Sequence, residues 1–282
     1  MKPILNELFN TLDEFRSFVP YVESNATFDE LNSSAVNARK QIMIIITMPV
    51  YKEILQADDE KKDALKSAMA NLTLAKQMIF DVIKRRKDDI DLYKHEQEQM
   101  KRSFIDNYYN SMDTLMQLLS SSNSEAWKNT RYAQKMDSLK IPTTDRFDEL
   151  YPIDMSFLFF FRTISLQQEA LEHGVGSYFA RIAEHPEQEA VLLRCLAKLT
   201  VSIALRRFDP LEFPATIRNL FEDSTANRNN GHEQERILTL SKELEAEVTA
   251  ALRDVDTLLS DSGVVDSRTC SNEESDKIFL MP

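Results

Sequence analysis

The sequence predicts an all-α fold of two tandem helical-bundle repeats, followed by an extended C-terminal tail that can include a short β segment. Three observations predict it. The chain has 282 residues but only 4 glycines, the first of which is Gly174, whereas average usage would give about twenty. Helix-forming Leu, Ala, Glu, Lys and Met are abundant. Apolar residues recur at spacings of three and four, which is typical of one face of a helix.

The scarcity of glycine also excludes several classes of site. A phosphate-binding loop, a dinucleotide-binding turn and a nucleophile elbow each need glycine where the backbone approaches a phosphate or turns sharply. Hairpin-rich sheets need glycine for positive φ. We therefore expect helices joined by Asn, Ser, Asp and Pro turns, and no enzyme built on these motifs.

The first two expected helices lie before Pro49. A short helix over residues 10–19 ends before Pro20, and a longer one begins near residues 27–29 and ends before Pro49. The C-terminal part of the longer helix, Ile42–Met48, is apolar on all sides, which predicts burial. The run Met155–Phe161 in the second half is also expected to be a buried helical segment, since both runs are too short to span a bilayer.

Two more helices complete the first half. The acids Asp58–Glu60 lie where they favour the positive end of a helix, and this helix is expected to reach the basic run at 84–87. The last helix ends at the serines and Asn of residues 120–124, and Trp127–Lys140 is expected to be a polar linker. Its apolar stripe consists of Phe104, Tyr108, Met112, Leu115 and Leu119.

The same order of motifs occurs a second time. Four matches in register predict an internal duplication, with a first repeat over residues 1–140, a second over 141–260 and a tail over 261–282. The second-half connection over 208–231 is longer than its counterpart and is expected to protrude. The matching segments are Asp13-Glu14-Phe15 with Asp145-Arg146-Phe147, Ala70–Leu74 with Ala197–Val201, His95–Glu98 with His232–Glu235, and Asp113–Leu115 with Asp256–Leu258.

Charge and cysteine usage narrow the class of protein. The net charge of −12 disfavours general binding to nucleic acid or anionic membranes. The two cysteines, Cys195 and Cys270, are far apart in the sequence and have no nearby ligand residue. We expect free thiols and a reducing compartment in preference to a disulfide. The N-terminal stretch carries acids among its apolar residues and does not resemble a signal peptide.

No motif for a metal, a cofactor or catalysis is complete. His95 and His232 each begin a zincin-like pattern, but the second histidine is replaced by Gln99 and Arg236, so both imidazoles cannot lie on one helix face. No Glu-x-x-His occurs, which excludes the di-iron bundle pattern. The pair Gly174 and Gly176 is expected to form a turn with glycine in the left-handed region. We therefore expect no enzyme, no cofactor and no metal.

Two segments are candidate interaction sites. Lys84, Arg85, Arg86 and Lys87 form a dense basic run, followed closely by Lys94, Lys101 and Arg102; it could meet phosphates or an acidic partner, or be a solvated helix end. Ile278, Phe279, Leu280 and Met281 form an apolar stretch in the polar tail and are expected to be a short strand or anchor. Residues 222–282 hold 14 acids against 6 bases, which suits head-to-tail contacts between copies.

With this duplicated layout, the chain resembles a family of bacteriophage-encoded helical proteins that carry two tandem connector-like units and serve as head–tail connector or head-completion proteins. The resemblance covers nearly the whole chain and depends on the order of its patterns. The residues that carry it are Phe15-x-x-Phe18-Val19-Pro20-Tyr21, Ala64–Phe80, Lys101-Arg102 with Asn107–Asn110 and Asp113, Phe147–Pro152, Leu196–Phe208 and Lys277-Ile278-Phe279.

The resemblance implies a structural virion protein that forms an adaptor ring, typically twelvefold, beneath the portal at the neck of the particle. Such rings retain packaged DNA, which passes through the lumen without specific binding, and they dock tail or further connector proteins. Before assembly the protein would be in the host cytoplasm, and no membrane contact is implied. A tail-completion or head-fibre attachment protein is an alternative within the virion. The alternative from another class is a cytoplasmic helical-repeat module that binds a protein partner without enzymatic activity.

Overall fold

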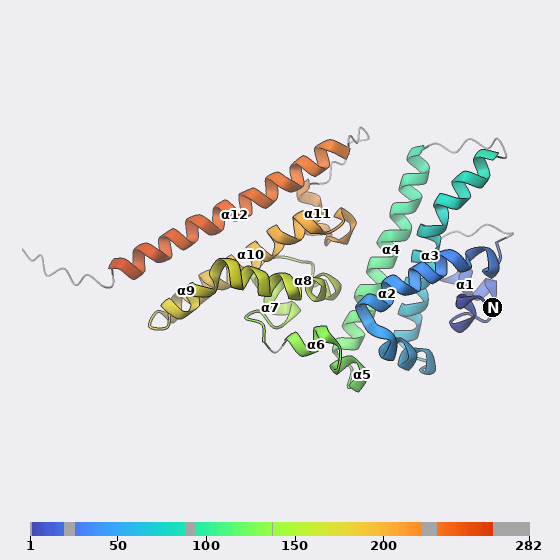
Figure 1. The fold of residues 1–282 in the computed structure, drawn as a ribbon, viewed down its shortest axis with the longest axis horizontal. Helices are drawn as coiled ribbons and strands as arrows, with labels where there is room; N and C mark the ends of the chain where they lie inside the picture. Colours follow the sequence, from blue (N-terminus) through green and yellow to red (C-terminus); the bar gives the residue numbers. More distant parts are fainter. Residues whose placement is uncertain (1, 20–25, 88–93, 137, 222–229, 262–282) are drawn as a thin grey trace, which may run out of the picture.

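The computed structural model describes residues 2–19, 26–87, 94–136, 138–221 and 230–261, and these ranges contain helices and connections but no strand. The all-α prediction is confirmed for this part of the chain. The tail beyond Asp261, where a short β segment was expected, lies outside the described residues. Figure 1 shows the first-half helices at one end of the molecule and α8–α12 at the other.

The first half contains three long helices in a row. Helix α3 packs against both α2 and α4, so it occupies the middle of this half. Short helices precede and follow the three. The elements are η1 (Ile4–Glu7), α1 (Leu12–Ser17), α2 (Phe28–Gln56), α3 (Glu60–Lys87), α4 (Lys94–Ser120), α5 (Glu125–Lys128) and α6 (Arg131–Met136).

The second half has the same order of long helices with more interruptions. Helix α10 packs against both α8 and α12, as α3 does against α2 and α4. The elements are α7 (Thr144–Leu150), α8 (Phe157–Ala170), the π-helical η2 (Leu171–Val175), α9 (Gly176–Arg181), η3 (Pro186–Gln188), α10 (Glu189–Arg207), η4 (Pro210–Glu212), α11 (Ala215–Phe221) and α12 (Asn230–Asp261).

Helices α1 and α7 open the two halves in the same way. Thr11 caps α1 by accepting a hydrogen bond from the backbone N–H three residues on, and Thr143 caps α7 in the same manner. Threonine at this position satisfies an N–H group that has no partner within the helix. Phe15 and Phe147 follow the two caps at the same spacing, and both are fully buried. Internal duplication remains a prediction. Two duplicated repeats would be expected to share a local structure of this kind.

One hydrophobic core runs through both halves. Buried side chains of α2, α3 and α4 belong to the same cluster as those of α8, α10 and α11, and α4 packs directly on α8. The stripe from Phe104 to Leu119 is buried as predicted. The prediction for the run Met155–Phe161 was wrong in part: Leu158–Phe161 of α8 are buried, whereas Met155 precedes the helix and is 38% exposed. No helix in the described part of the chain is both long and apolar enough to cross a membrane.

Helix α2 differs from its prediction. It was expected to end before Pro49, and its backbone does leave the helical region at Thr47 (φ 68°, ψ 161°), but a further helical segment continues to Gln56. Burial of the whole run Ile42–Met48 was wrong: Ile42, Ile45 and Ile46 are buried, whereas Ile44 is 62% exposed and Met48 is also exposed. The run therefore meets the core along one face only.

Two connections expected to be polar or protruding are packed instead. Residues 127–140 include the short helices α5 and α6, and the buried Trp127 ring meets Phe161 edge to face at 5.2 Å. The connection after α10 folds back over residues 208–221, because Phe213, Ile217 and Phe221 are buried in the core. Its continuation, 222–229, lies outside the described residues.

Gly174 and Gly176 do not form the left-handed turn that was expected. Neither has positive φ; Gly174 lies in the π-helical turn η2, and Gly176 begins α9 by donating its N–H to the Leu171 carbonyl. Glycine is required at these two positions because neighbouring atoms lie too close to leave room for a Cβ atom. A Cβ at Gly176 would collide with the Leu171 backbone oxygen, and one at Gly174 would lie 2.7 Å from Cδ1 of Leu199.

Candidate docking groove

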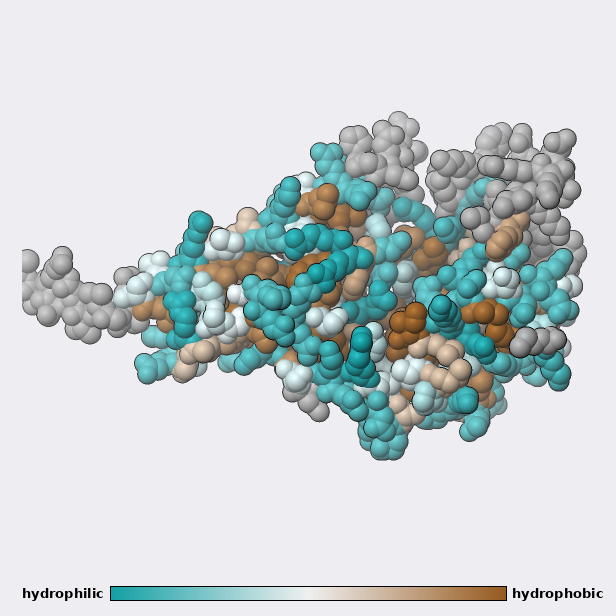
Figure 2. Space-filling model, viewed as in Figure 1, coloured by the Kyte–Doolittle hydropathy of each residue, from teal (hydrophilic) through white to brown (hydrophobic). Residues whose placement is uncertain are grey.

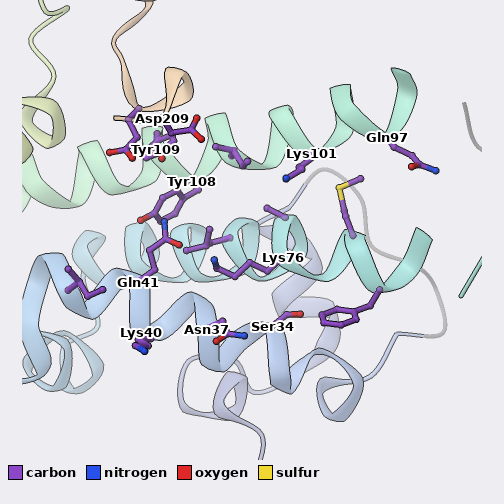
Figure 3. Close-up of a pocket in the computed structure, with 17 residues that line it drawn as sticks. Ser34, Asn37, Lys40, Gln41, Lys76, Gln97, Lys101, Tyr108, Tyr109 and Asp209 are labelled. Atoms are coloured by element: carbon purple, nitrogen blue, oxygen red, sulfur yellow. The ribbon is translucent and has the colours of Figure 1, made fainter. Parts of the chain in front are cut away.

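A groove of about 1150 Å³ lies between α2 and α4, with α3 between them and η4 at one end. We call it the α2–α4 groove. It exists because α3 packs against both neighbouring helices and leaves space between their outer faces. Figure 3 shows its lining side chains extending from the three helices toward the space between them.

Much of the groove lining is apolar. Leu72 and Ala75 of α3 are buried, whereas Ile44 of α2 and Phe80 of α3 are 62% and 51% exposed. Met78 and Ile105 add partly buried apolar surface. Figure 2 shows hydrophobic side chains at the surface over the region of α2–α4, between hydrophilic ones. Large apolar side chains that remain exposed beside a groove are typical of a protein-docking surface.

Three lysines line the groove, Lys40 on α2, Lys76 on α3 and Lys101 on α4, and Figure 3 shows Lys76 and Lys101 on neighbouring helices. Burial lowers the pKa of Lys76, and the positive charge of Lys101 lowers it further. Among the described residues, neither the Lys76 nor the Lys101 ammonium group forms an ion pair. Two cations that repel each other, the half-buried Lys76 and the exposed Lys101, favour the arrival of an anionic group.

The opposite end of the groove is acidic and already partnered. Glu212 of η4 pairs with Arg162 of α8 at 2.7 Å. Burial raises the pKa of Glu212, and the Arg162 charge acts in the opposite direction. Asp209 caps η4 by accepting from the Leu211 N–H. Figure 3 shows Asp209 close to Tyr109, away from Lys101 and Gln97. The groove therefore has acidic side chains at its η4 end, where Glu212 is paired with Arg162, and the lysines Lys76 and Lys101 lie away from that end (Figure 3).

A tyrosine pair separates the groove from the core. Tyr108 is 1% exposed and its ring lies 5.0 Å from that of Tyr109. The Tyr108 hydroxyl makes no hydrogen bond with any described residue. Burial raises the pKa of both phenols, so they stay protonated in the physiological range. A water-sized cavity lined by these tyrosines, Arg162 and Glu212 continues inward from the groove.

Two kinds of reactive group, a metal cluster and an activated thiol, are absent from the described residues. These residues contain no group of three or more His, Cys, Asp or Glu side chains placed to hold a metal ion. Cys195 is a buried free thiol, and burial raises its pKa, which disfavours the reactive thiolate. The groove combines apolar contact with paired positive charge, an arrangement suited to an acidic and apolar segment of protein.

The structure describes the predicted interaction residues only in part. Lys84–Lys87 occupy the last turn of α3, beyond Phe80, but their side chains lie outside what the structure describes. Ile278–Met281 are also outside the described residues. Of the basic residues that follow the run, Lys101 lines the groove, whereas Arg102 lies 3.8 Å from Glu233 of α12.

Sequence reasoning did not single out Lys76, Ile44 or Phe80. A sequence pattern could have identified Ile44 and Phe80. Each is a large apolar residue beside the buried stripe of its helix, so each is expected to stay exposed. No sequence pattern distinguishes Lys76, because a single lysine in an amphipathic helix is ordinary.

Comparison with protein-family models, curated proteins and solved structures finds no match. The fold and the groove define a class of structure, an all-α protein with a surface groove lined by apolar side chains and lysines. The resemblance to phage connector proteins depends on the sequence patterns quoted above.

Proposed function

We propose that this protein is a structural virion subunit that assembles into a head–tail connector ring beneath a phage portal. In this role it helps to retain packaged DNA and docks tail or further connector proteins. It would act at the neck of the particle after passing through the host cytoplasm.

The α2–α4 groove is the observation that carries the proposal. A connector subunit acts through contacts with copies of itself and with neighbouring proteins, so it needs exposed surfaces that combine apolar area with uncompensated charge. Ile44 and Phe80 provide the first, and Lys76 and Lys101 the second. The net charge of −12 suits a ring through which DNA passes, because phosphates bind strongly to cationic walls.

The order of helices also supports a scaffold role. Each half presents three long helices with the middle one packed against the other two, and a single core joins the halves. A body with a core shared by both halves suits a subunit that holds a fixed position in a ring.

The mass of the assembly tests this proposal. We expect native mass spectrometry and negative-stain microscopy of the full chain to show closed rings, either alone or on adding the portal protein encoded beside its gene. A twelvefold ring would weigh twelve times the 32.6 kDa protomer. A portal from an unrelated phage is the control. A discrete monomer that ignores its neighbouring portal would contradict the proposal.

The same groove supports a second candidate function, a helical-repeat module that binds one protein partner. That module would stay a monomer or dimer and would bind its partner in a fixed ratio. The mass measurement therefore separates the two functions, because only the connector forms a closed ring of many copies.

A further inference from the structure

We propose that the α2–α4 groove of one copy receives the segment Ser271–Pro282 of a second copy. The acids of that segment would lie on Lys76 and Lys101, and its apolar residues on Ile44 and Phe80. The inference deepens the proposed function and rests on it, since it supplies the contact by which copies assemble.

Charge complementarity is the first argument. Lys76 and Lys101 share the groove without an ion pair among the described residues. The segment places Glu273, Glu274 and Asp276 within four positions. A carboxylate between the two ammonium groups relieves their mutual repulsion and gains two attractive contacts, which are strongest where water is partly excluded.

Apolar complementarity is the second argument. The acids are followed, after Lys277, by Ile278-Phe279-Leu280-Met281, a cluster costly to leave in water. The groove offers the exposed side chains of Ile44 and Phe80 above the buried Leu72 and Ala75. The segment thus carries acidic and apolar residues, and the groove presents lysines and exposed apolar side chains.

The length of chain between Asp261 and Glu273 favours a segment that comes from a second copy. Helix α12 begins beside α4, where Glu233 lies 3.8 Å from Arg102, and it runs to Asp261 at the other end of the molecule (Figure 1). At 1.5 Å per residue, Asp261 lies about 42 Å from Glu233. Twelve residues separate Asp261 from Glu273 and span about 40 Å when fully extended. The segment of the same chain would therefore need a straight, taut path with no slack.

Docking of this kind is a head-to-tail contact. The donor surface and the acceptor surface are different, so each copy can give and receive one segment. Such heterologous contacts close into rings when the rotation between copies permits and otherwise extend into filaments.

The first experiment measures docking directly. A dye-labelled peptide of residues 266–282, with Cys270→Ser to prevent oxidation, is titrated into the full chain and followed by fluorescence anisotropy. We expect saturable binding that weakens as salt rises. Lys76→Glu/Lys101→Glu should weaken binding at least tenfold. Lys52→Glu/Lys242→Glu makes the same change in net charge at two exposed lysines outside the groove and should leave binding within twofold.

The second experiment tests docking between copies by complementation. One full-length variant carries Lys76→Glu/Lys101→Glu, and the other carries Glu273→Lys/Glu274→Lys/Asp276→Lys. Each variant alone pairs like charges and should lose self-association in light scattering. Their mixture restores an acidic segment on a basic groove and should recover association. A mixture that stays as monomeric as its components would overturn docking between copies.

The outcomes distinguish this inference from the proposed function. Rings that persist in Lys76→Glu/Lys101→Glu, without peptide binding, would overturn the docking inference and leave the connector intact. Peptide binding and complementation without closed rings would support docking and contradict the connector. Lysine-dependent binding of a DNA duplex in place of the peptide would overturn the inference. Circular dichroism of each variant confirms that its helices are retained.

Discussion

The Asp113 carboxylate on α4 accepts a hydrogen bond from the Leu158 backbone N–H at 2.7 Å, at the start of α8. The same oxygen accepts a hydrogen bond from the Ser156 hydroxyl at 2.8 Å. The Ser156 hydroxyl oxygen in turn caps α8 by accepting a hydrogen bond from the Phe159 N–H. A helix in the first half therefore satisfies the N-terminus of a helix in the second. Burial raises the pKa of Asp113, while the hydrogen bonds from Leu158 and Ser156 lower it.

Asp113→Ala should destabilise the protein. It leaves the Leu158 N–H and the Ser156 hydroxyl without this acceptor, and we expect the free energy of unfolding to fall by about 1–3 kcal/mol. Asp113→Asn keeps an acceptor oxygen and should cost less. Urea denaturation followed by circular dichroism measures both. Asp58→Ala, at a fully exposed carboxylate, is the control, and an equal loss there would refute a special role for Asp113.

Glu14→Gln should destabilise the protein in a pH-dependent way. The hydrogen bond from Lys66 at 2.7 Å, and then the one from the Asn10 N–H, hold the pKa of Glu14 below its ordinary 4.5. The folded state thus binds this proton less tightly than the unfolded state. The stabilisation is complete above pH 4.5 and is lost as pH falls through the lowered pKa.

At pH 7 we expect Glu14→Gln to lower the free energy of unfolding by about 1 kcal/mol. Urea denaturation at pH 7 and at successively lower pH should show the difference from the unmodified chain shrinking below pH 4.5. Glu125→Gln, at an exposed carboxylate, should show little difference at either pH. A gap for Glu14→Gln that stays constant with pH would contradict the assignment.

The two close-packed glycines should respond unequally to alanine. At Gly176 the new Cβ meets the backbone oxygen of Leu171, which cannot move without breaking the π-helical turn, and we expect a loss of about 1–3 kcal/mol. At Gly174 it meets only the end of the Leu199 side chain. That chain can rotate away, and alanine favours the helix, so Gly174→Ala should be near neutral. Thermal denaturation compares the pair; equal losses would contradict this account.

Thr47→Gly should stabilise the protein. Thr47 has φ 68° and ψ 161°, a region that β-branched residues occupy at a cost of about 1–3 kcal/mol. Glycine removes that strain but is more flexible in the unfolded chain, so we expect a net gain of about 1 kcal/mol in urea denaturation. Thr249→Gly, in the regular helix α12, should lose about 0.5 kcal/mol. A loss at both positions would contradict strain at Thr47.

The helices were predictable because their signals are local. The stripe from Phe104 to Leu119 needs only the 3.6-residue period of one helix to be recognised. The threonine caps at Thr11 and Thr143 lie three residues from the N–H groups they satisfy. The buried Trp127 could not be predicted in this way, because its partner Phe161 lies on a helix that follows much later in the chain.

The groove residues could not be predicted from local signals either. Lys101 and Arg102 are neighbours in the sequence, yet Lys101 lines the groove while Arg102 approaches Glu233 of α12. Successive residues of a helix point about 100° apart, so adjacent positions meet different partners. No local pattern reveals which partner each will meet.

The sequence by itself determined that the described part of this protein is helical, and it indicated the three long helices of the first half and the buried stripe of α4, since these follow from glycine scarcity and helical periodicity. Only the tertiary structure decided that Lys76 and Lys101 share a groove and form no ion pair with a described residue, and that Asp113 accepts a hydrogen bond from the first turn of α8. The physical reason is that both relationships join residues on different helices. Their geometry depends on how the helices pack, which no short stretch of sequence encodes.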